Sequence, residues 1–280
     1  TGQVVRRSYA VAAWQRYTIY VNEEIGPGQD VSIKVTADQN IVVERPMYFL
    51  YQGVWDGGHN TMAVNSAHTE WFFAEGCTRA GFNQWICIQN PGDEPAKVDI
   101  TYMTEDGTQI VKQATVQPHS RHTVNANQDV AREHDVSTKL ASDNPIIVER
   151  PMYFWYGNLG GFNEGSGAIG ANKACSTWYL AEGCTRAGFE QWICLQNPND
   201  DVATVRLTYM LENASCPEQV VSVAPHTRLT VRVNDFVGPD HDVSTEVQSD
   251  MPIVVERPIY SLYRGEWPAA DSLNAYTFER

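Results

Sequence analysis

The sequence is poor in basic residues and lacks the short motifs by which common enzyme classes are recognised. It has 20 Lys and Arg residues against 34 Asp and Glu residues, and its formal net charge is −14. Nucleic acids and anionic lipid surfaces attract basic proteins, so this balance argues against both as partners. Gly-x-Ser-x-Gly, His-Glu-x-x-His, a phosphate-binding loop and a dinucleotide fingerprint are all missing. We therefore expect no enzyme, no catalytic residues and no cofactor.

Long hydrophobic runs and helical periodicity are missing as well. No apolar run approaches the ~18 residues that a membrane helix needs, so we expect no membrane insertion. No segment has a clear apolar period of 3.6 residues. Short apolar stretches instead alternate with clusters of Gly, Pro, Asn and Asp. This pattern predicts an all-β protein built of Ig-like antiparallel β-sandwiches.

A tandem repeat is the main feature that the sequence does contain. Trp71–Cys77 (WFFAEGC) returns 107 positions later as Trp178–Cys184 (WYLAEGC). The string IVERPMY at 147–153 returns as VVERPIY and also occurs earlier as IVVERPMY. A fixed period of this length with strand-like content in each period indicates tandem domains. We expect complete sandwiches at residues 70–176 and 177–280, and a partial unit at residues 1–69.

Each complete unit is expected to contain seven strands. In the second unit these lie at residues 71–75, 85–89, 97–103, 110–116, 121–125, 136–141 and 146–153. The segments 52–69 and 157–177 are rich in Gly, Asn, Ser and Ala, which predicts connectors between units.

The partial unit aligns with only the last four strands of the repeat. Half a sandwich would leave an apolar face and open strand edges exposed. We therefore expect its missing strands to come from an upstream segment or from another chain. Strand addition between chains would build a head-to-tail assembly, with the protein itself as the partner.

The six cysteines form pairs by position. Cys77 and Cys87 flank a short turn, and neither this pair nor its repeat has the Cys-x-x-Cys spacing of a zinc or redox site. Two strands that meet at a turn would bring such a pair face to face. The expected disulfides are Cys77–Cys87, Cys184–Cys194 and Cys175–Cys216. Paired cysteines indicate an oxidising, extracytoplasmic compartment, whereas the alternative is six reduced buried thiols.

A Glu-Arg-Pro string recurs once in each unit. Its residues are Glu44 and Arg45, Glu149 and Arg150, and Glu256 and Arg257. Proline cannot donate to a β-ladder, which places this part of the strand at an edge or a bulge. We expect a structural ion pair with the neighbouring strand or unit, and the alternative is recognition of a ligand. Glu75 and Glu182 open the repeat, and we expect them to form cross-strand hydrogen bonds rather than to act as catalytic carboxylates.

Aromatic clusters precede the Gly-rich stretches, and they include Trp55, Trp155 and Trp267. They are expected to fill the interface between consecutive sandwiches, where aromatic residues are enriched. The alternative is that they stack on sugars. His134-Asp135 and its repeat invite a metal-site interpretation, but Gln29 replaces the histidine in the first unit. With no second cluster at zinc-like spacing, we expect no metal site.

The strings Trp-x-x-Ala-Glu-Gly, Asn-Pro and Ile-Val-x-Glu-Arg-Pro-Met-Tyr resemble an uncharacterised tandem repeat of bacterial cell-surface proteins. The resemblance covers the whole chain and implies an extracellular, β-rich protein of several units. It implies no activity. We therefore expect a stalk or filament at the cell surface, and the alternative function is a glycan-binding adhesin that uses Trp55, Trp155 and Trp267.

Overall fold

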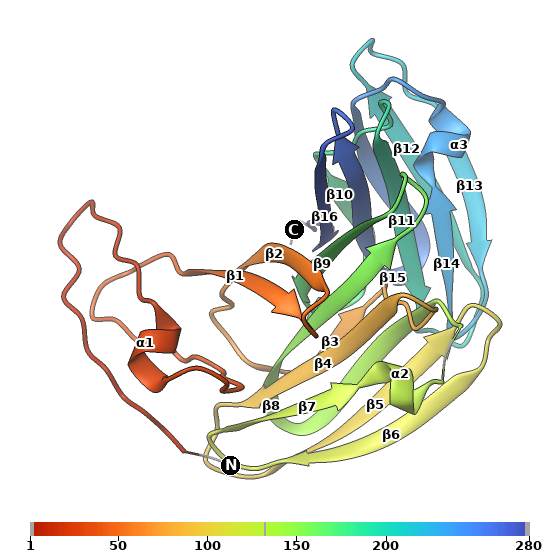
Figure 1. Cartoon of the computed structure of the whole chain (residues 1–280). Coiled ribbons are helices and arrows are strands. Elements are labelled where there is room, and N and C mark those ends of the chain that lie inside the picture. The colour runs from red at the N-terminus through yellow and green to blue at the C-terminus, as the bar shows by residue number, and fades with distance from the viewer. Residues whose placement is uncertain (1–2, 132, 278–280) are drawn as a thin grey trace.

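The computed structural model describes residues 3–131 and 133–277, and most of them lie in antiparallel β-strands (Figure 1). Two complete units have the same strand order and pairing, and a β-hairpin of the partial unit packs against the first of them. The prediction of an all-β sandwich fold is confirmed.

The second unit contains seven strands and one short helix. They are β3 (His68–Phe73), β4 (Phe82–Asn90), β5 (Ala96–Thr104), β6 (Gln109–Val116), β7 (Ser120–Asn125), α2 (Ala126–Asp129), β8 (Val136–Tyr156) and β9 (Phe162–Ile169). The first half of β8 pairs with β5 and β3, and its second half pairs with β4 and β9. One long strand therefore belongs to both layers, β6-β5-β8-β3 and β7-β4-β8-β9. The two strands expected at 136–141 and 146–153 are this single strand.

The third unit repeats this arrangement. Its elements are β10 (Cys175–Leu180), β11 (Phe189–Asn197), β12 (Ala203–Leu211), β13 (Glu218–Val223), β14 (Thr227–Arg232), α3 (Val233–Val237), β15 (Val243–Tyr263) and β16 (Trp267–Asn274). β15 takes the part of β8, because it pairs with both β12 and β11.

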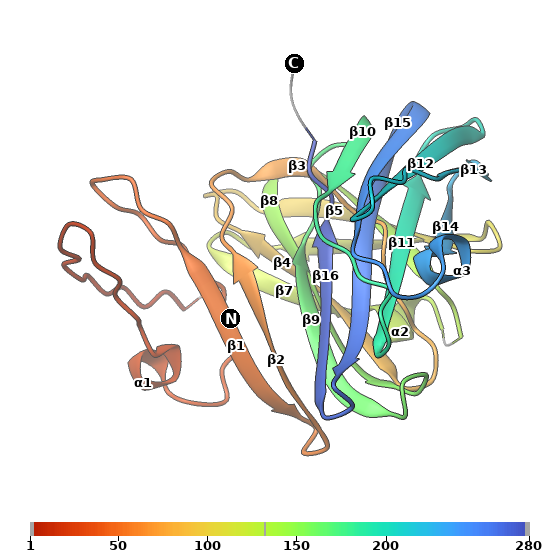
Figure 2. The same ribbon diagram turned by 90° about the horizontal axis from the view of Figure 1, so that it is seen from above.

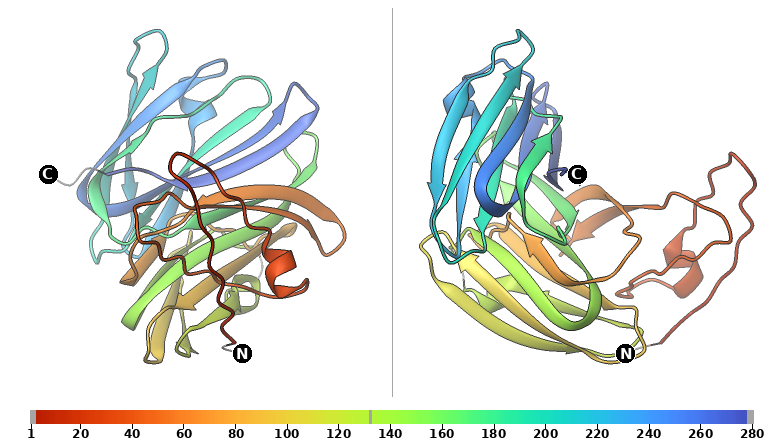
Figure 3. Two further views of the ribbon diagram at one scale, coloured as in Figure 1. Left: turned by 90° about the vertical axis from the view of Figure 1, so that its left-hand side faces the viewer. Right: turned by 180° about the vertical axis from the view of Figure 1, so that it is seen from behind.

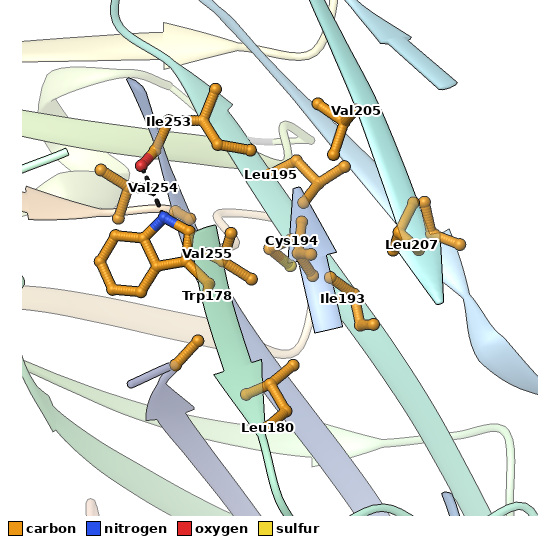
Figure 4. Packing of buried hydrophobic residues seen from close by; sticks show 14 of the residues in the cluster. Trp178, Leu180, Ile193, Cys194, Leu195, Val205, Leu207, Ile253, Val254 and Val255 are labelled. Carbon is orange, nitrogen blue, oxygen red and sulfur yellow. Dashed lines mark hydrogen bonds between the residues drawn. The ribbon is translucent and has the colours of Figure 1, made fainter. Parts of the chain in front are cut away.

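Alternating side chains of the two layers form the core of each unit. In the third unit Trp178, Leu195 and Leu207 belong to one buried cluster, and the Trp178 indole Nε1 donates to the carbonyl of Ile253 at 2.9 Å (Figure 4). Trp71 makes the same bond to Ile146 at 2.9 Å. Burial of each large apolar side chain contributes roughly 1.5–3 kcal/mol. The recurring tryptophan therefore anchors the first strand of every complete unit.

The partial unit departs from its predicted structure. Residues 3–43 form no strand and only the short helix α1 (Val21–Ile25), and they extend to one side of the sandwiches (Figure 3). Of the four expected strands only the last one forms, as β1 (Glu44–Tyr51). In complete units these strands pair with the counterparts of β4 and β5, which the first unit lacks, so their backbone groups have no partner strand.

The expected connectors also contain strands. β2 (Trp55–Met62) lies within 52–69 and pairs with β1, just as β9 pairs with β8 and β16 with β15. Each of these strands folds back on the strand that precedes it and forms a hairpin. β2 then contacts β9, and β9 contacts β16, so the three run side by side along the molecule (Figure 2). The segments expected to be linkers therefore build the contact between units.

Candidate functional site: the interfaces between repeat units

Arg150 lies at the centre of the interface between the second and third units, and its side chain is fully buried. Its guanidinium donates to the backbone oxygen and to Oε2 of Glu75, both at 2.7 Å, within its own unit. It also donates to Oε2 of Glu256 in the third unit at 2.7 Å. A planar guanidinium suits this simultaneous recognition of two carboxylates. One side chain therefore ties the two units together.

Further polar groups complete the network. Ser272 Oγ bonds both Arg150 and Glu75, and the Tyr260 hydroxyl donates to Oε1 of Glu75 at 3.3 Å. Burial raises the pKa of Glu256, and the positive charge of Arg150 opposes that shift. Buried ions are tolerated when they are paired and hydrogen-bonded.

A second buried arginine reaches across the same interface. Arg228 donates to the carbonyls of Gly76 at 2.7 Å and Val136 at 3.2 Å, both in the second unit. Burial disfavours the charge of Arg228, but nearby groups that include Asp135 and Glu75 favour it, and its pKa is raised. The interface thus contains two buried arginines whose charges are compensated by carboxylates and carbonyl groups.

Aromatic rings line the other side of this contact. The rings of Tyr156 and Tyr260 stack in parallel, with their centroids 3.9 Å apart. Phe154 meets Tyr260 edge-on at 5.4 Å. Aromatic pairs of this kind contribute about 0.5–1.5 kcal/mol beyond the burial of their area.

The first interface, between the partial unit and the second unit, repeats three of these contacts at equivalent positions. The contacts are Arg45 to Glu149 at 2.8 Å, Tyr51 stacked on Tyr153 at 4.2 Å, and Arg121 donating to the carbonyl of Val31 at 3.0 Å. They correspond to the contacts that Arg150, Tyr156 and Arg228 make. We call this set of contacts between consecutive units the joint. The same joint is therefore formed twice within one chain.

Glycines of β9 allow the β1–β2 hairpin to approach this strand closely. A Cβ atom on Gly165 would lie 2.6 Å from the ring of Phe49, and a Cβ atom on Gly167 would lie 2.5 Å from the ring of His59. Both distances are shorter than any normal contact. Only residues without a side chain permit this packing.

The Glu-Arg strings are placed as follows. Arg45 and Arg150 each contact the glutamate of the next copy, Glu149 and Glu256. Arg257 contacts Glu182 within its own unit at 3.1 Å, and Glu44 accepts a bond from Asn60. The arginines of β7 and β14 and Tyr153 were not among the residues predicted from the sequence, whereas Tyr51, Tyr156 and Tyr260 belong to the aromatic clusters that were expected at the interface between units. The recurrence of the missed residues at the repeat period, Arg121 with Arg228 and Tyr153 with Tyr260, is the signal that could have found them.

The predicted disulfides within the turns are wrong, since Cys77, Cys87, Cys184 and Cys194 are free thiols. The backbone N–H of Cys77 donates to the side chain of Gln84 at 2.7 Å. The chain therefore turns back so that Gln84 faces Cys77, while Cys87 lies three residues further along β4, roughly 10 Å away. The Cys87 and Cys194 thiols instead accept from Arg121 and Arg228.

The third predicted disulfide is also wrong, because Cys175 and Cys216 are free as well. Cys175, the first residue of β10, pairs with Ile253 of β15. Cys216 lies in the turn after β12. Met210, near the end of β12, pairs with Ser244. Ser244 and Ile253 are nine positions apart along β15, a distance on the order of 30 Å. The two thiols thus lie at opposite ends of the sheet.

The three tryptophans of the adhesin hypothesis lie near the hairpin turns. Trp155 and Trp267 are 50% and 54% exposed, and Trp55 is partly buried. Trp55 stacks on Tyr51, and Trp267 stacks on Tyr263. Trp55 also lines a pocket of about 370 Å³ together with Arg79, Phe82 and four amide-bearing residues, Asn83, Asn125, Asn127 and Gln128.

Metal-binding clusters and membrane-spanning helices are both absent from the described residues. Within residues 3–131 and 133–277, no group of three or more His, Cys, Asp and Glu side chains could hold a metal ion. Over the same ranges, no helix has the length and apolar character needed to cross a membrane.

No protein-family model matches this chain, and no curated protein sequence is significantly similar to it. Among solved structures, a Thermotoga maritima protein (1070) is 23% identical with a TM-score of 0.35, over 39% of this chain and 96% of that one. The Anabaena sensory rhodopsin transducer is 27% identical with a TM-score of 0.28, over 31% and 99% of the two chains. Red sea bream transglutaminase is 11% identical with a TM-score of 0.17, over 78% and 32%. TM-scores this low establish no shared function.

Proposed function

We propose that this protein is a structural repeat protein, a segment of a stalk or filament in which the joints between β-sandwiches are rigid. The observation that carries the proposal is the twofold use of one joint, with an arginine–glutamate contact and a tyrosine stack at each. In repeat arrays, such nearest-neighbour contacts fix the geometry and supply much of the stability. Glu256, a carboxylate whose pKa is raised by burial, lies inside the joint and is paired there, which supports a structural role for it.

The same proposal places the protein outside the cell. It rests on the resemblance of the repeat strings to those of bacterial cell-surface proteins. The cysteines do not support it, because all six are free thiols.

Small-angle X-ray scattering on the whole chain tests the rigid joint. We expect the measured curve to match a single arrangement of the second and third units. The curve of Arg150→Ala should require many relative orientations of the two units, because the buried carboxylates of Glu75 and Glu256 lose their shared cation. A wild-type curve that requires many relative orientations of the two units would contradict the proposal.

A glycan-binding adhesin is the second candidate, favoured by the pocket beside Trp55. An aromatic wall with several side-chain amides suits a small polar ligand, and the pocket has the size of known ligand sites. Binding to a glycan array that disappears in Trp55→Ala, but persists in Trp267→Ala, would support this function.

A further inference from the structure

The outer face of the third unit has no partner among the described residues. We call it the tail face and define it by the exposed side chains of Glu182, Tyr263, Trp267, Leu273 and Tyr276 together with Arg257, whose side chain is 3% exposed beneath Glu182. The equivalent positions of the second unit are covered by the third unit. Tyr156 is 7% exposed whereas Tyr263 is 46% exposed, and Phe162 is 8% exposed whereas Trp267 is 54% exposed. Clusters of exposed apolar side chains of this kind mark interaction sites.

Arg257 is already held in the geometry of the joint. It donates to the backbone oxygen of Glu182 at 2.5 Å and to Oε2 of Glu182 at 3.1 Å. Arg150 makes the same two bonds to Glu75, and it binds the carboxylate of Glu256 in addition. Among the described residues, Arg257 forms no ion pair with a second carboxylate. The Glu182 side chain is 78% exposed, whereas that of Glu75 is 5% exposed.

The β1–β2 hairpin carries the opposite half of the joint. Glu44 and Tyr48 occupy the positions of Glu256 and Tyr260, which complete the joint in the third unit. In the second and third units these positions are covered by the preceding unit. In the hairpin, by contrast, Tyr48 is 86% exposed and Glu44 lies at the surface. One chain thus exposes both halves of the joint, the tail face on its third unit and the β1–β2 hairpin of its partial unit.

We propose that the tail face binds the β1–β2 hairpin of a second copy of this chain. Arg257 pairs with Glu44 of the second copy, and Tyr263 stacks on its Tyr48. Two observations favour a second copy as the partner. The contact would repeat the joint that is formed twice inside the chain, and Arg257 and Glu44 have opposite charges. A head-to-tail contact leaves a free half at each end, so it extends to longer assemblies. The inference rests on the proposed function, because it takes the intrachain joint as a docking mode.

Sedimentation velocity over a range of concentrations tests this contact with Tyr48→Ala, Tyr263→Ala and the control Tyr20→Ala. Tyr20 is exposed and lies on neither half of the joint. We expect the wild type and the control to associate as concentration rises, and each of the other variants to associate at least tenfold more weakly. An equimolar mixture of Tyr48→Ala and Tyr263→Ala should form dimers and nothing larger, because one intact tail face and one intact hairpin remain.

Two results would overturn the proposal. Association of both variants at wild-type strength would place the contact elsewhere. A folded wild type that stays monomeric at all concentrations would exclude a second copy and leave a further repeat of a longer chain as the occupant. Neither result would affect the rigid intrachain joint, which the scattering experiment tests separately.

Discussion

Arg150 holds carboxylates from two different units at a site that is closed to solvent. Its replacement by alanine would leave Glu75 and Glu256 buried without a cation. Loss of one member of a buried ion pair costs about 3–5 kcal/mol. We therefore expect Arg150→Ala to lower the free energy of unfolding by about that amount in urea titrations.

Arg257→Ala is the matched control, because its partner Glu182 is mostly exposed and regains water. It should cost much less than Arg150→Ala. Equal losses for the two variants would show that the arginine acts within its own unit and not at the joint.

The free thiols differ in reactivity according to their burial. Burial raises the pKa of Cys77 and of Cys194 to about 12, so neither forms thiolate near neutral pH. Cys216 is exposed. Because the thiolate is the reactive form, we expect a maleimide to label Cys216 rapidly in the folded chain and to leave Cys77 and Cys194 unlabelled. Peptide mapping checks this, and fast labelling of Cys194 would contradict its position in the joint.

His59 makes the first joint sensitive to pH. Burial, and secondly the charge of Arg45, lower its pKa from the ordinary 6.5 to about 4. As pH falls below 6.5, the undocked hairpin takes up a proton before the docked one does. Docking is therefore at full strength above pH 6.5 and weakens as pH falls towards 4.

Amide resonances of residues 55–62, followed by NMR across this pH range, should report the loss of docking. In His59→Gln the change between pH 6.5 and 4 should disappear. An unchanged pH response in that variant would assign the effect to other groups.

At the residue scale, the sequence indicated which side chains matter but not all of their partners. The Glu-Arg strings pointed to ion pairs with a neighbour. The Glu75 side chain is expected to bond only within its own unit, but it also bonds Ser272, and alternation along a strand says nothing of a residue 197 positions away. The disulfides failed for a related reason. The predicted disulfide assumed a register in which Cys87 faces Cys77. In the structure Gln84 faces Cys77, and Cys87 lies three residues further along β4.

At the scale of the elements, the β1–β2 hairpin packs against the β8–β9 hairpin and joins the first two units. Glycine residues of β9 permit β2 to lie this close. A Cβ atom on Gly167 would overlap the His59 ring. We expect Gly167→Ala to displace β2 and to abolish hydrogen-exchange protection across residues 44–62. Protection of β5 and β6 should remain, because they lie in the core of the second unit.

Gly92→Ala provides the control for this substitution. Its added Cβ atom would meet no atom closer than 3.3 Å, so residues 44–62 should keep their protection. Loss of protection in both variants would mean that the hairpin is not held by close packing on β9.

At the element scale, periodicity located the strands well and the hairpins poorly. β4 to β7 form where alternating residues and turn formers predicted them. Segments 52–69 and 157–177 looked like connectors, because they are rich in glycine. Those glycines instead serve interunit packing at β2 and β9, which composition alone does not distinguish from a flexible linker.

For the whole molecule, the repeat predicted two complete sandwiches and a partial unit. What the sequence left open was the geometry of their contact, because a joint depends on the relative placement of residues about 107 positions apart. The buried charges and the stacked tyrosines make that contact as specific as a domain core. We therefore expect the second and third units to behave as one cooperative structure.

Hydrogen exchange across a urea series, followed separately in β5 of the second unit and β12 of the third, tests this cooperativity most directly. Strong coupling between neighbouring repeats makes them unfold together. We predict that both strands lose protection at the same urea concentration. Loss of protection in one of them while the other stays fully protected would contradict a rigid joint between the units.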